Sequence, residues 1–200
     1  MGGRAGGGSG MGSGTRSGDA SMRHLSAKAQ KVLKAEEEAI RDAKVEHGLV
    51  MDINGNIVWK GTQNKKNTVS LGGNLENNIT LHNHPQDSRK TISFSKTDLL
   101  NDARANVAEG RVVSGNYTYS IKRPKEGWRK GGWVGDKFYS NNAYAYKKAK
   151  ATVDKRIKEY YKATTGSKAS YPRVNATYWH LVTKEYAKIQ GYQYTKTKVK

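Results

Sequence analysis

The chain has 200 residues, which is enough for one ordinary domain with extensions, and its hydrophobic content of 35% is low. It contains no cysteine, which excludes disulfides and thiolate metal ligands. The net charge is +19, and residues 122–200 carry 20 Lys or Arg against 5 Asp or Glu. A basic half of this kind favours nucleic acid, an acidic protein surface or anionic lipid as a partner, unless its lysines only keep solvated helices soluble.

Two kinds of apolar segment are missing from the sequence. No run of about 18 apolar residues occurs, so we expect no transmembrane helix and no membrane partner. The N-terminus shows no apolar core of a secretory signal. The expected compartment is therefore the cytoplasm of the producing cell.

The N-terminal part divides into a tail and a helix. Residues 1–20 are mostly Gly, Ser and Arg, which predicts a flexible, disordered tail. Residues 22–44 carry apolar side chains near a 3.6-residue period, with Ser21 as a candidate N-cap. Lys and Glu lie between them, which indicates a helix with one solvated face.

A β-hairpin is predicted over residues 48–60. Two apolar runs flank Asn54 and Gly55, and Asn-Gly between such runs is a strong hairpin signal. Glu46 lies at the entrance to the first strand, and its neighbour His47 is expected to point to the other face. Residues 67–70 are a candidate short strand, and residues 72–78 are expected to form a loop or a short helix leading to the next strand.

The next segment holds two histidines at strand spacing. Residues 78–81 are β-prone, and His82, Asn83, His84 and Pro85 follow them. Residues two apart on a strand share a face, so His82 and His84 project side by side, with Asn83 opposite. Proline fits best where strand pairing stops. Two imidazoles at the end of a strand make half of a metal site.

The other half of the site is predicted just downstream. Ser95 followed by Asp98 before an apolar pair is a helix-start signature, and capping alone would account for both residues. A loop into that helix would bring Asp98 back towards His82 and His84. Two imidazoles, one carboxylate and an open fourth position form the ligand set of a catalytic zinc site.

The string from His82 to Pro85, followed by Ser95 and Asp98, resembles the signature of the JAB/MPN/JAMM metalloprotease superfamily, and is most similar to its bacterial RadC-like branch. That family also needs a glutamate on an earlier strand, and Glu46 matches it in the right order. The resemblance covers residues 46–113. It departs from the common pattern in one respect, because ten residues separate His84 from Ser95.

The resemblance implies a fold and an activity. The fold is α+β, with a mixed sheet flanked by helices. The implied activity is a zinc metallopeptidase or isopeptidase, in which His82, His84 and Asp98 bind Zn²⁺. Glu46 is then the general base for the attacking water, and Ser95 stabilises the oxyanion. The implied partner is a protein or peptide substrate.

The C-terminal half is predicted to be helical and basic. A helix is expected over residues 96–108, closed by Gly110, and a strand over 111–121. Aromatics among basic residues at 127–139 are interpreted as a core edge, with base stacking as the alternative. Helices are expected over residues 141–162 and 175–189, followed by a basic tail at 192–200. His180 has no motif around it and is interpreted as a surface residue.

This pattern predicts three parts: the tail at 1–20, a JAB/MPN-like metal-binding domain at 21–123, and a basic extension at 124–200 packed on it. The alternative function is a nucleic-acid-binding or phage-assembly protein with an inactive JAB-like domain. The glycine-rich head and JAB-like core are similar in style to domains of phage minor head proteins and bacterial polymorphic toxins. If the chain derives from a phage or a toxin, we expect it to be virion-associated or delivered, and not cytoplasmic.

Other histidine-containing metallohydrolases fit the sequence less well. Amidohydrolases and PHP phosphoesterases also begin with HxH, but they need several further histidines. Only His24, His47 and His180 remain in the chain, without supporting motifs. An HNH nuclease is excluded because His82, Asn83 and His84 are contiguous here, whereas the three residues of the HNH motif are spaced apart along the sequence.

Overall fold

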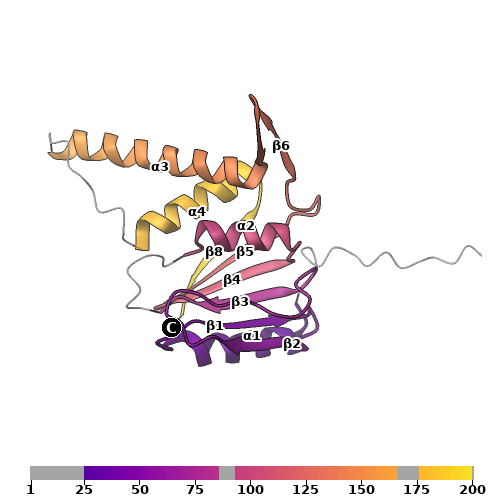
Figure 1. Cartoon of the computed structure of the whole chain (residues 1–200). Helices are drawn as coiled ribbons and strands as arrows, with labels where there is room; N and C mark the ends of the chain where they lie inside the picture. Colours follow the sequence, from indigo (N-terminus) through magenta and orange to yellow (C-terminus); the bar gives the residue numbers. More distant parts are fainter. Residues whose placement is uncertain (1–24, 86–92, 166–175, 200) are drawn as a thin grey trace, which may run out of the picture.

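The computed structural model describes residues 25–85, 93–165 and 176–199 (Figure 1). Within these residues the helices are α1 (Ala27–Arg41), α2 (Lys96–Arg104), α3 (Asn141–Thr165) and α4 (Ala176–Gln190). The strands are β1 (His47–Met51), β2 (Ile57–Thr62), β3 (Ile79–Asn83), β4 (Glu109–Ser114), β5 (Tyr117–Lys122), β6 (Gly131–Val134), β7 (Lys137–Ser140) and β8 (Gln193–Lys198).

A mixed sheet forms the centre of the molecule. Its strand order is β2-β1-β3-β4-β5-β8, and β6 and β7 form a separate two-stranded hairpin. Only β3 and β4 run parallel, and the other neighbours in the sheet are antiparallel. The predicted α+β class, with a mixed sheet flanked by helices, is confirmed.

Alternation along β3 and β4 divides their side chains between the two faces of the sheet. Ile79 and Leu81 of β3 join the core beneath α1. Val112 of β4 joins the core on the opposite face, which α2, α3 and α4 cover. Thr80 and His82 alternate with Leu81, so they lie on the face that α2 covers.

The connection between β3 and β4 determines where α2 begins. Parallel neighbours cannot be joined by a tight turn, so the chain leaves β3 and returns through α2 to the start of β4. The first turn of α2 therefore lies near the end of β3, which carries His82 and His84. The last turn of α2 leads back to the start of β4.

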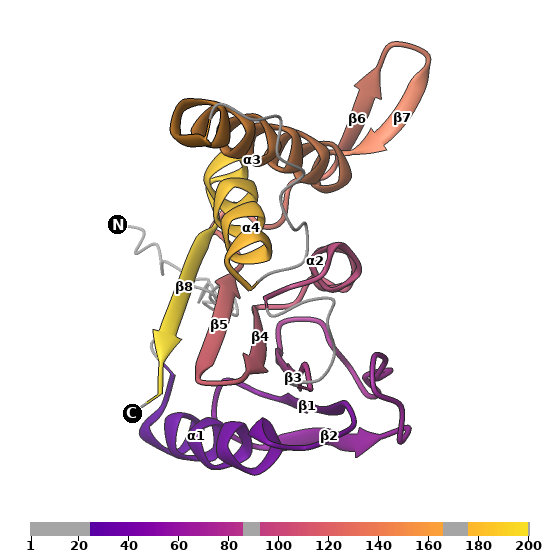
Figure 2. The ribbon, with the colours of Figure 1, turned by 90° about the vertical axis from the view of Figure 1, so that its left-hand side faces the viewer.

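The C-terminal segments complete the sheet and the second core. β8 pairs along its whole length with β5, at the edge opposite β2. α3 and α4 pack against each other (Figure 2), and their apolar side chains share one cluster with Phe94, Leu99 and Tyr119. The predicted domain boundary at residue 123 stays a prediction.

Three strands lie where the sequence predicts none. β6 and β7 form within the glycine-rich aromatic segment, and β8 replaces the basic tail expected at 192–200. In β8 most side chains are exposed, so the strand is held by backbone pairing with β5 and not by an apolar face. The single strand predicted over 111–121 is instead β4 and β5, joined by a turn in which Gly115 has φ of +51°.

Two further expectations are wrong for local reasons. The helix predicted to end at residue 108 ends at Arg104, because Asn106 adopts a left-handed φ of +54°. Residues 67–70 do not form a strand. The Gln63 side chain takes the place of a partner strand there: its Oε1 accepts from the Ser70 N–H at 2.7 Å, and its Nε2 donates to the Ser70 carbonyl at 3.2 Å.

The remaining N-terminal expectations concern the tail and the first helix. The predicted first helix is confirmed as α1, but it begins after Ser26 and not after Ser21, so the predicted cap is wrong; the Ser26 hydroxyl accepts from the Ala29 N–H at 3.0 Å. The tail at 1–20 and the candidate cap Ser21 lie outside the described residues. In the part of the chain that the structure describes, no helix combines the length and apolar character needed to cross a bilayer.

Candidate metal centre

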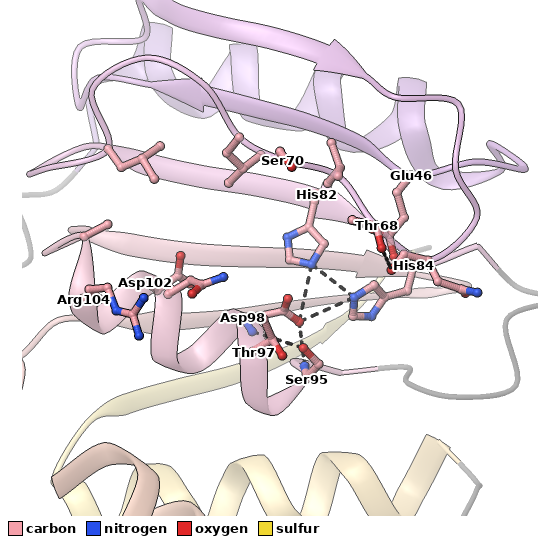
Figure 3. A pocket seen from close by; sticks show the side chains of 16 residues that line it. Glu46, Thr68, Ser70, His82, His84, Ser95, Thr97, Asp98, Asp102 and Arg104 are labelled. Carbon is pink, nitrogen blue, oxygen red and sulfur yellow. Dashed lines mark hydrogen bonds and ion pairs between the residues drawn. The ribbon is translucent and has the colours of Figure 1, made fainter. Parts of the chain in front are cut away.

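His82 and His84 project from the end of β3 towards α2 (Figure 3). His82 pairs with Gly48 of β1 and Val112 of β4, in the middle of the sheet. The His84 N–H donates to the Val113 carbonyl at 2.8 Å, which holds the chain straight one residue beyond the strand. Both imidazoles are buried, and their Nε2 atoms lie 3.1 Å apart.

Asp98 is fixed at the first turn of α2 by a capping box. Its backbone N–H donates to the Ser95 hydroxyl at 3.1 Å, and its Oδ2 accepts from the Ser95 N–H at 2.6 Å. The same Oδ2 lies 3.6 Å from Nε2 of both His82 and His84. The helix cap thus aims the carboxylate at the two imidazoles.

These three side chains can hold a metal ion. Their ligand atoms all lie within 4.8 Å of one another. Ligands at about 2.0–2.2 Å around a tetrahedral ion lie about 3.3–3.6 Å apart. The separations of 3.1 and 3.6 Å here are close to that range. Two imidazole nitrogens and one carboxylate also form a donor set that suits a divalent cation, so the residues fit the group that the sequence predicts.

The charges of the site interact strongly. Burial lowers the pKa of His82, but the Asp98 carboxylate outweighs it, with help from Glu46, so the pKa of His82 is raised. Burial opposes ionisation of Asp98, but His82, His84 and the Ser95 N–H hold the pKa of Asp98 well below its ordinary range. Asp98 is therefore a carboxylate at neutral pH, as a cation ligand should be.

Glu46 lines the same cavity as the three candidate ligands. The cavity has a volume of about 720 Å³, and Ser95 and the segment 67–71 also line it. Burial, with the Asp98 charge, raises the pKa of Glu46 from 4.5 to about 7, and His82 and the Val69 N–H act in the opposite direction. Glu46 thus lies close to its titration point at neutral pH.

Asn83 positions the segment that carries Glu46. Its side chain lies on the face of β3 opposite the histidines, as predicted, and it is fully buried. Its Oδ1 accepts from the His47 N–H at 2.6 Å, and its Nδ2 donates to the Val45 carbonyl at 3.1 Å. These two bonds bracket Glu46, so one amide ties the residue before β1 to the end of β3.

A second buried acid in the cavity was missed from the sequence. Asp102 lies one turn after Asp98 on α2, and its Oδ1 accepts from the Thr80 hydroxyl at 3.1 Å. Burial, with the Asp98 charge, raises its pKa from 3.8 to about 7. The i, i+4 spacing from Asp98 was the signal that could have placed it on the same helix face.

The other two histidines with a described position stay outside this cluster. His47 begins β1, and His180 lies half-buried on α4 with its Nδ1 2.9 Å from the Tyr194 hydroxyl. His180 is therefore partly enclosed by β8 and is not a simple surface residue. His24 lies outside the described residues.

The structure thus brings together the five residues that the sequence singles out: Glu46, His82, His84, Ser95 and Asp98. Residues 86–92, within the ten-residue segment between His84 and Ser95, lie outside the described residues. Comparison with protein-family models, with curated proteins and with solved structures finds no match to this chain.

Proposed function

We propose that this chain is a zinc-dependent metallopeptidase or isopeptidase of the JAB/JAMM type. One observation carries the proposal: His82, His84 and Asp98 converge at ligand distance in a cavity that Glu46 also lines. If His82, His84 and Asp98 had a purely structural role, nothing would account for the buried Glu46 carboxyl that lines the same cavity.

Zinc would be held by His82, His84 and Asp98, and it would supply Lewis acidity, lowering the pKa of water and polarising a carbonyl. Glu46 is the general base in this proposal. It takes a proton from the attacking water and returns it to the leaving amine, two transfers that a pKa of about 7 suits at neutral pH.

Ser95 is proposed to stabilise the oxyanion that forms on the attacked carbonyl. Its hydroxyl accepts one hydrogen bond from the Asp98 N–H, and a serine hydroxyl can still donate its own proton. Because that hydroxyl lines the cavity, it can donate to a carbonyl oxygen placed beside the metal ligands.

The size of the cavity favours a segment of peptide as substrate. A volume of about 720 Å³ lies within the range of about 300–1,000 Å³ typical of ligand sites, and it admits a few residues at a time. The proposed substrate is a peptide or isopeptide bond in an exposed chain segment, and a folded domain would have to present such a segment.

The test uses a Glu46→Gln variant and a panel of peptide and isopeptide substrates. The amide keeps the shape of Glu46 but cannot accept a proton, so hydrolysis should fall by at least about a hundredfold. Zinc content should be unchanged, because Glu46 is not a ligand. Glu76→Gln, which changes an exposed carboxylate outside the cavity, is the matched control and should keep full activity.

Two outcomes contradict the proposal. Hydrolysis that survives in Glu46→Gln would remove its role as base, and zinc loss in that variant would make it a ligand instead. Activity that persists after chelator treatment, with zinc shown to be gone, would exclude a metal-dependent reaction altogether.

A further inference from the structure

A second cleft lies on the other side of the first turn of α2. Lys96 borders it, and a residue two positions before Asp98 on a helix points roughly the opposite way. The opposite walls are Tyr139 of β7 and the first turns of α3, and the volume is about 460 Å³. The full lining is Lys96, Tyr139, Ala143, Tyr144, Tyr146, Lys147 and Lys150.

The chemistry of this lining is aromatic and cationic. It contains three tyrosines and three lysines, and no carboxylate among the described residues. Tyr146 is buried, whereas Tyr139 is 37% exposed and Tyr144 is half-buried, with the Lys148 Nζ 5.0 Å from its ring centroid. Both Tyr139 and Tyr144 thus keep part of their side chain accessible. Lys96 and Lys147 are exposed.

The remaining lysine of the cleft has a different role. Lys150 forms an ion pair with Asp154 at 3.0 Å, four residues along α3. It is thus partly neutralised, and Lys96 and Lys147 carry the charge that a ligand would meet. They come from different elements, α2 and α3, so the positive charge comes from two walls of the cleft.

The surroundings extend the same chemistry. The hairpin of β6 and β7 projects from the body beside the start of α3 (Figure 2), and its Trp133 is 74% exposed. Of the five acids in residues 122–200, Asp154, Glu159 and Glu185 are paired with Lys or Arg. Most of the described basic residues of this half are exposed to solvent.

We propose that the cleft between β7, α2 and α3 binds single-stranded nucleic acid. Accessible aromatic rings stack on unpaired bases of any sequence, and flanking lysines contact the phosphates. A duplex hides its base faces and could use only the lysines. An acidic peptide would likewise use the lysines but not the rings, so the accessible tyrosines favour a single strand.

This inference does not rest on the proposed hydrolase. The cleft and the metal centre share α2, but they use different residues and opposite sides of its first turn. Zinc content therefore reports on one site, and oligonucleotide affinity on the other.

The experiment measures fluorescence anisotropy of a labelled single strand of about 20 nucleotides with the full-length protein, and competition by a duplex of the same sequence and by polyglutamate. The single strand should bind at least about tenfold more tightly than the duplex. Affinity should fall as salt rises from about 50 to 200 mM, because bound lysines release counterions.

Stacking is tested by replacing Tyr139 and Tyr144 together with leucine. Leucine keeps apolar bulk but offers no ring, so single-strand affinity should fall by at least about tenfold while duplex affinity stays unchanged. Tyr160→Leu is the matched control, because Tyr160 lies on α3 away from the cleft and is 66% exposed. It should change affinity less than about threefold.

Two double variants test whether the position of the lysines matters for affinity. Lys96→Glu/Lys147→Glu changes the cleft, and Lys158→Glu/Lys162→Glu is its control. Both pairs change the net charge equally, and the second pair lies on the far half of α3, outside the cleft. The cleft pair should lose at least about tenfold more affinity than the control pair.

Any of three results would overturn the inference: no measurable binding of the single strand at the lower salt, equal binding of single strand and duplex, or equal loss from cleft and control variants. Displacement by polyglutamate as effective as by unlabelled single strand would assign the surface to acidic proteins instead. Circular dichroism and zinc content confirm that each variant is folded.

Discussion

Asn83, the residue between the two candidate metal ligands, ties together two segments of the candidate site. Strand alternation turns its amide away from His82 and His84, onto the face that α1 covers. There it bonds to both neighbours of Glu46. One residue thereby couples the strand that carries the candidate ligands to the segment that carries the candidate base.

We expect Asn83→Leu to separate metal binding from hydrolysis. The substitution leaves the His47 N–H and the Val45 carbonyl without their buried partner, at a cost of about 1–3 kcal/mol in stability. Glu46 loses its fixed position, so kcat should fall at least tenfold, while the zinc content stays that of the wild type. Unchanged hydrolysis in a folded variant would show that Asn83 does not position Glu46.

Asp102 makes a prediction about pH. A buried carboxyl whose pKa is raised from 3.8 to about 7 binds its proton more tightly in the native state than in the unfolded chain. The native state therefore loses stability as the pH rises through that window. Asp102→Asn removes the titration and can still accept from the Thr80 hydroxyl.

The variant should gain about 2.6 kcal/mol relative to wild type between pH 5 and pH 8. Urea unfolding of both proteins with a chelator present measures this, because metal-free samples keep the comparison free of zinc. Glu46 titrates in both proteins, so its contribution cancels in the difference between their free energies of unfolding. A stability difference that does not change with pH would show that Asp102 does not titrate between pH 5 and pH 8.

At the scale of elements, the first turn of α2 combines a helix cap with two residues of the candidate site. Ser95 and Asp98 form the capping box predicted from the sequence, and the same pair was also predicted to belong to the site. The capping role and the proposed role in the site are compatible, because the cap fixes the Asp98 side chain at the helix start, next to the end of β3. The parallel connection from β3 to β4 brings that start to the histidines.

Two substitutions of Ser95 distinguish the cap from the catalytic role. Ser95→Ala should cost about 1 kcal/mol in stability, whereas Ser95→Gly should cost only a few tenths. Both remove the hydroxyl, so both should lower kcat by about a hundredfold. Denaturant unfolding and steady-state kinetics measure the two effects. Activity that follows stability across the pair would reduce Ser95 to a cap.

Elements with a strong local signal were predictable, and those held only by distant pairing were not. The capping box of α2 and the periodicity of α1 are local, so the sequence sufficed for them. β8 alternates Tyr, Thr and Lys with little apolar character, and only its pairing with β5 makes it a strand. At residues 67–70 a strand was predicted and none forms. There the Gln63 side chain makes the hydrogen bonds that a partner strand would make.

At the scale of the whole molecule, the basic C-terminal half is part of the fold. Phe94 and Leu99, which flank the candidate site, share one core with α3 and α4. β8 also adds the last strand to the sheet. The sequence predicted a C-terminal extension that packs on the rest of the chain. It did not predict that the two parts share one core, because pairing between distant segments leaves no local sequence pattern.

A chain truncated after residue 123 should therefore fail to fold cooperatively. Removal of α3, α4 and β8 exposes Phe94, Leu99 and Tyr119, which are fully buried in the intact chain. Burial of such side chains contributes about 1.5–3 kcal/mol each. Thermal unfolding should show one transition for the full chain and none for the truncated one. A sharp transition in the fragment would instead make residues 21–123 an independent domain.

Zinc content is the most direct test of the account. Protein purified without chelator, then dialysed against metal-free buffer at neutral pH, should retain about one zinc per chain by mass spectrometry. His82→Ala and Asp98→Ala should retain none, and the cleft variant Lys147→Glu should match the wild type. A wild-type chain that neither retains zinc nor takes it up when zinc is added would contradict the metal centre, and with it the proposed hydrolase.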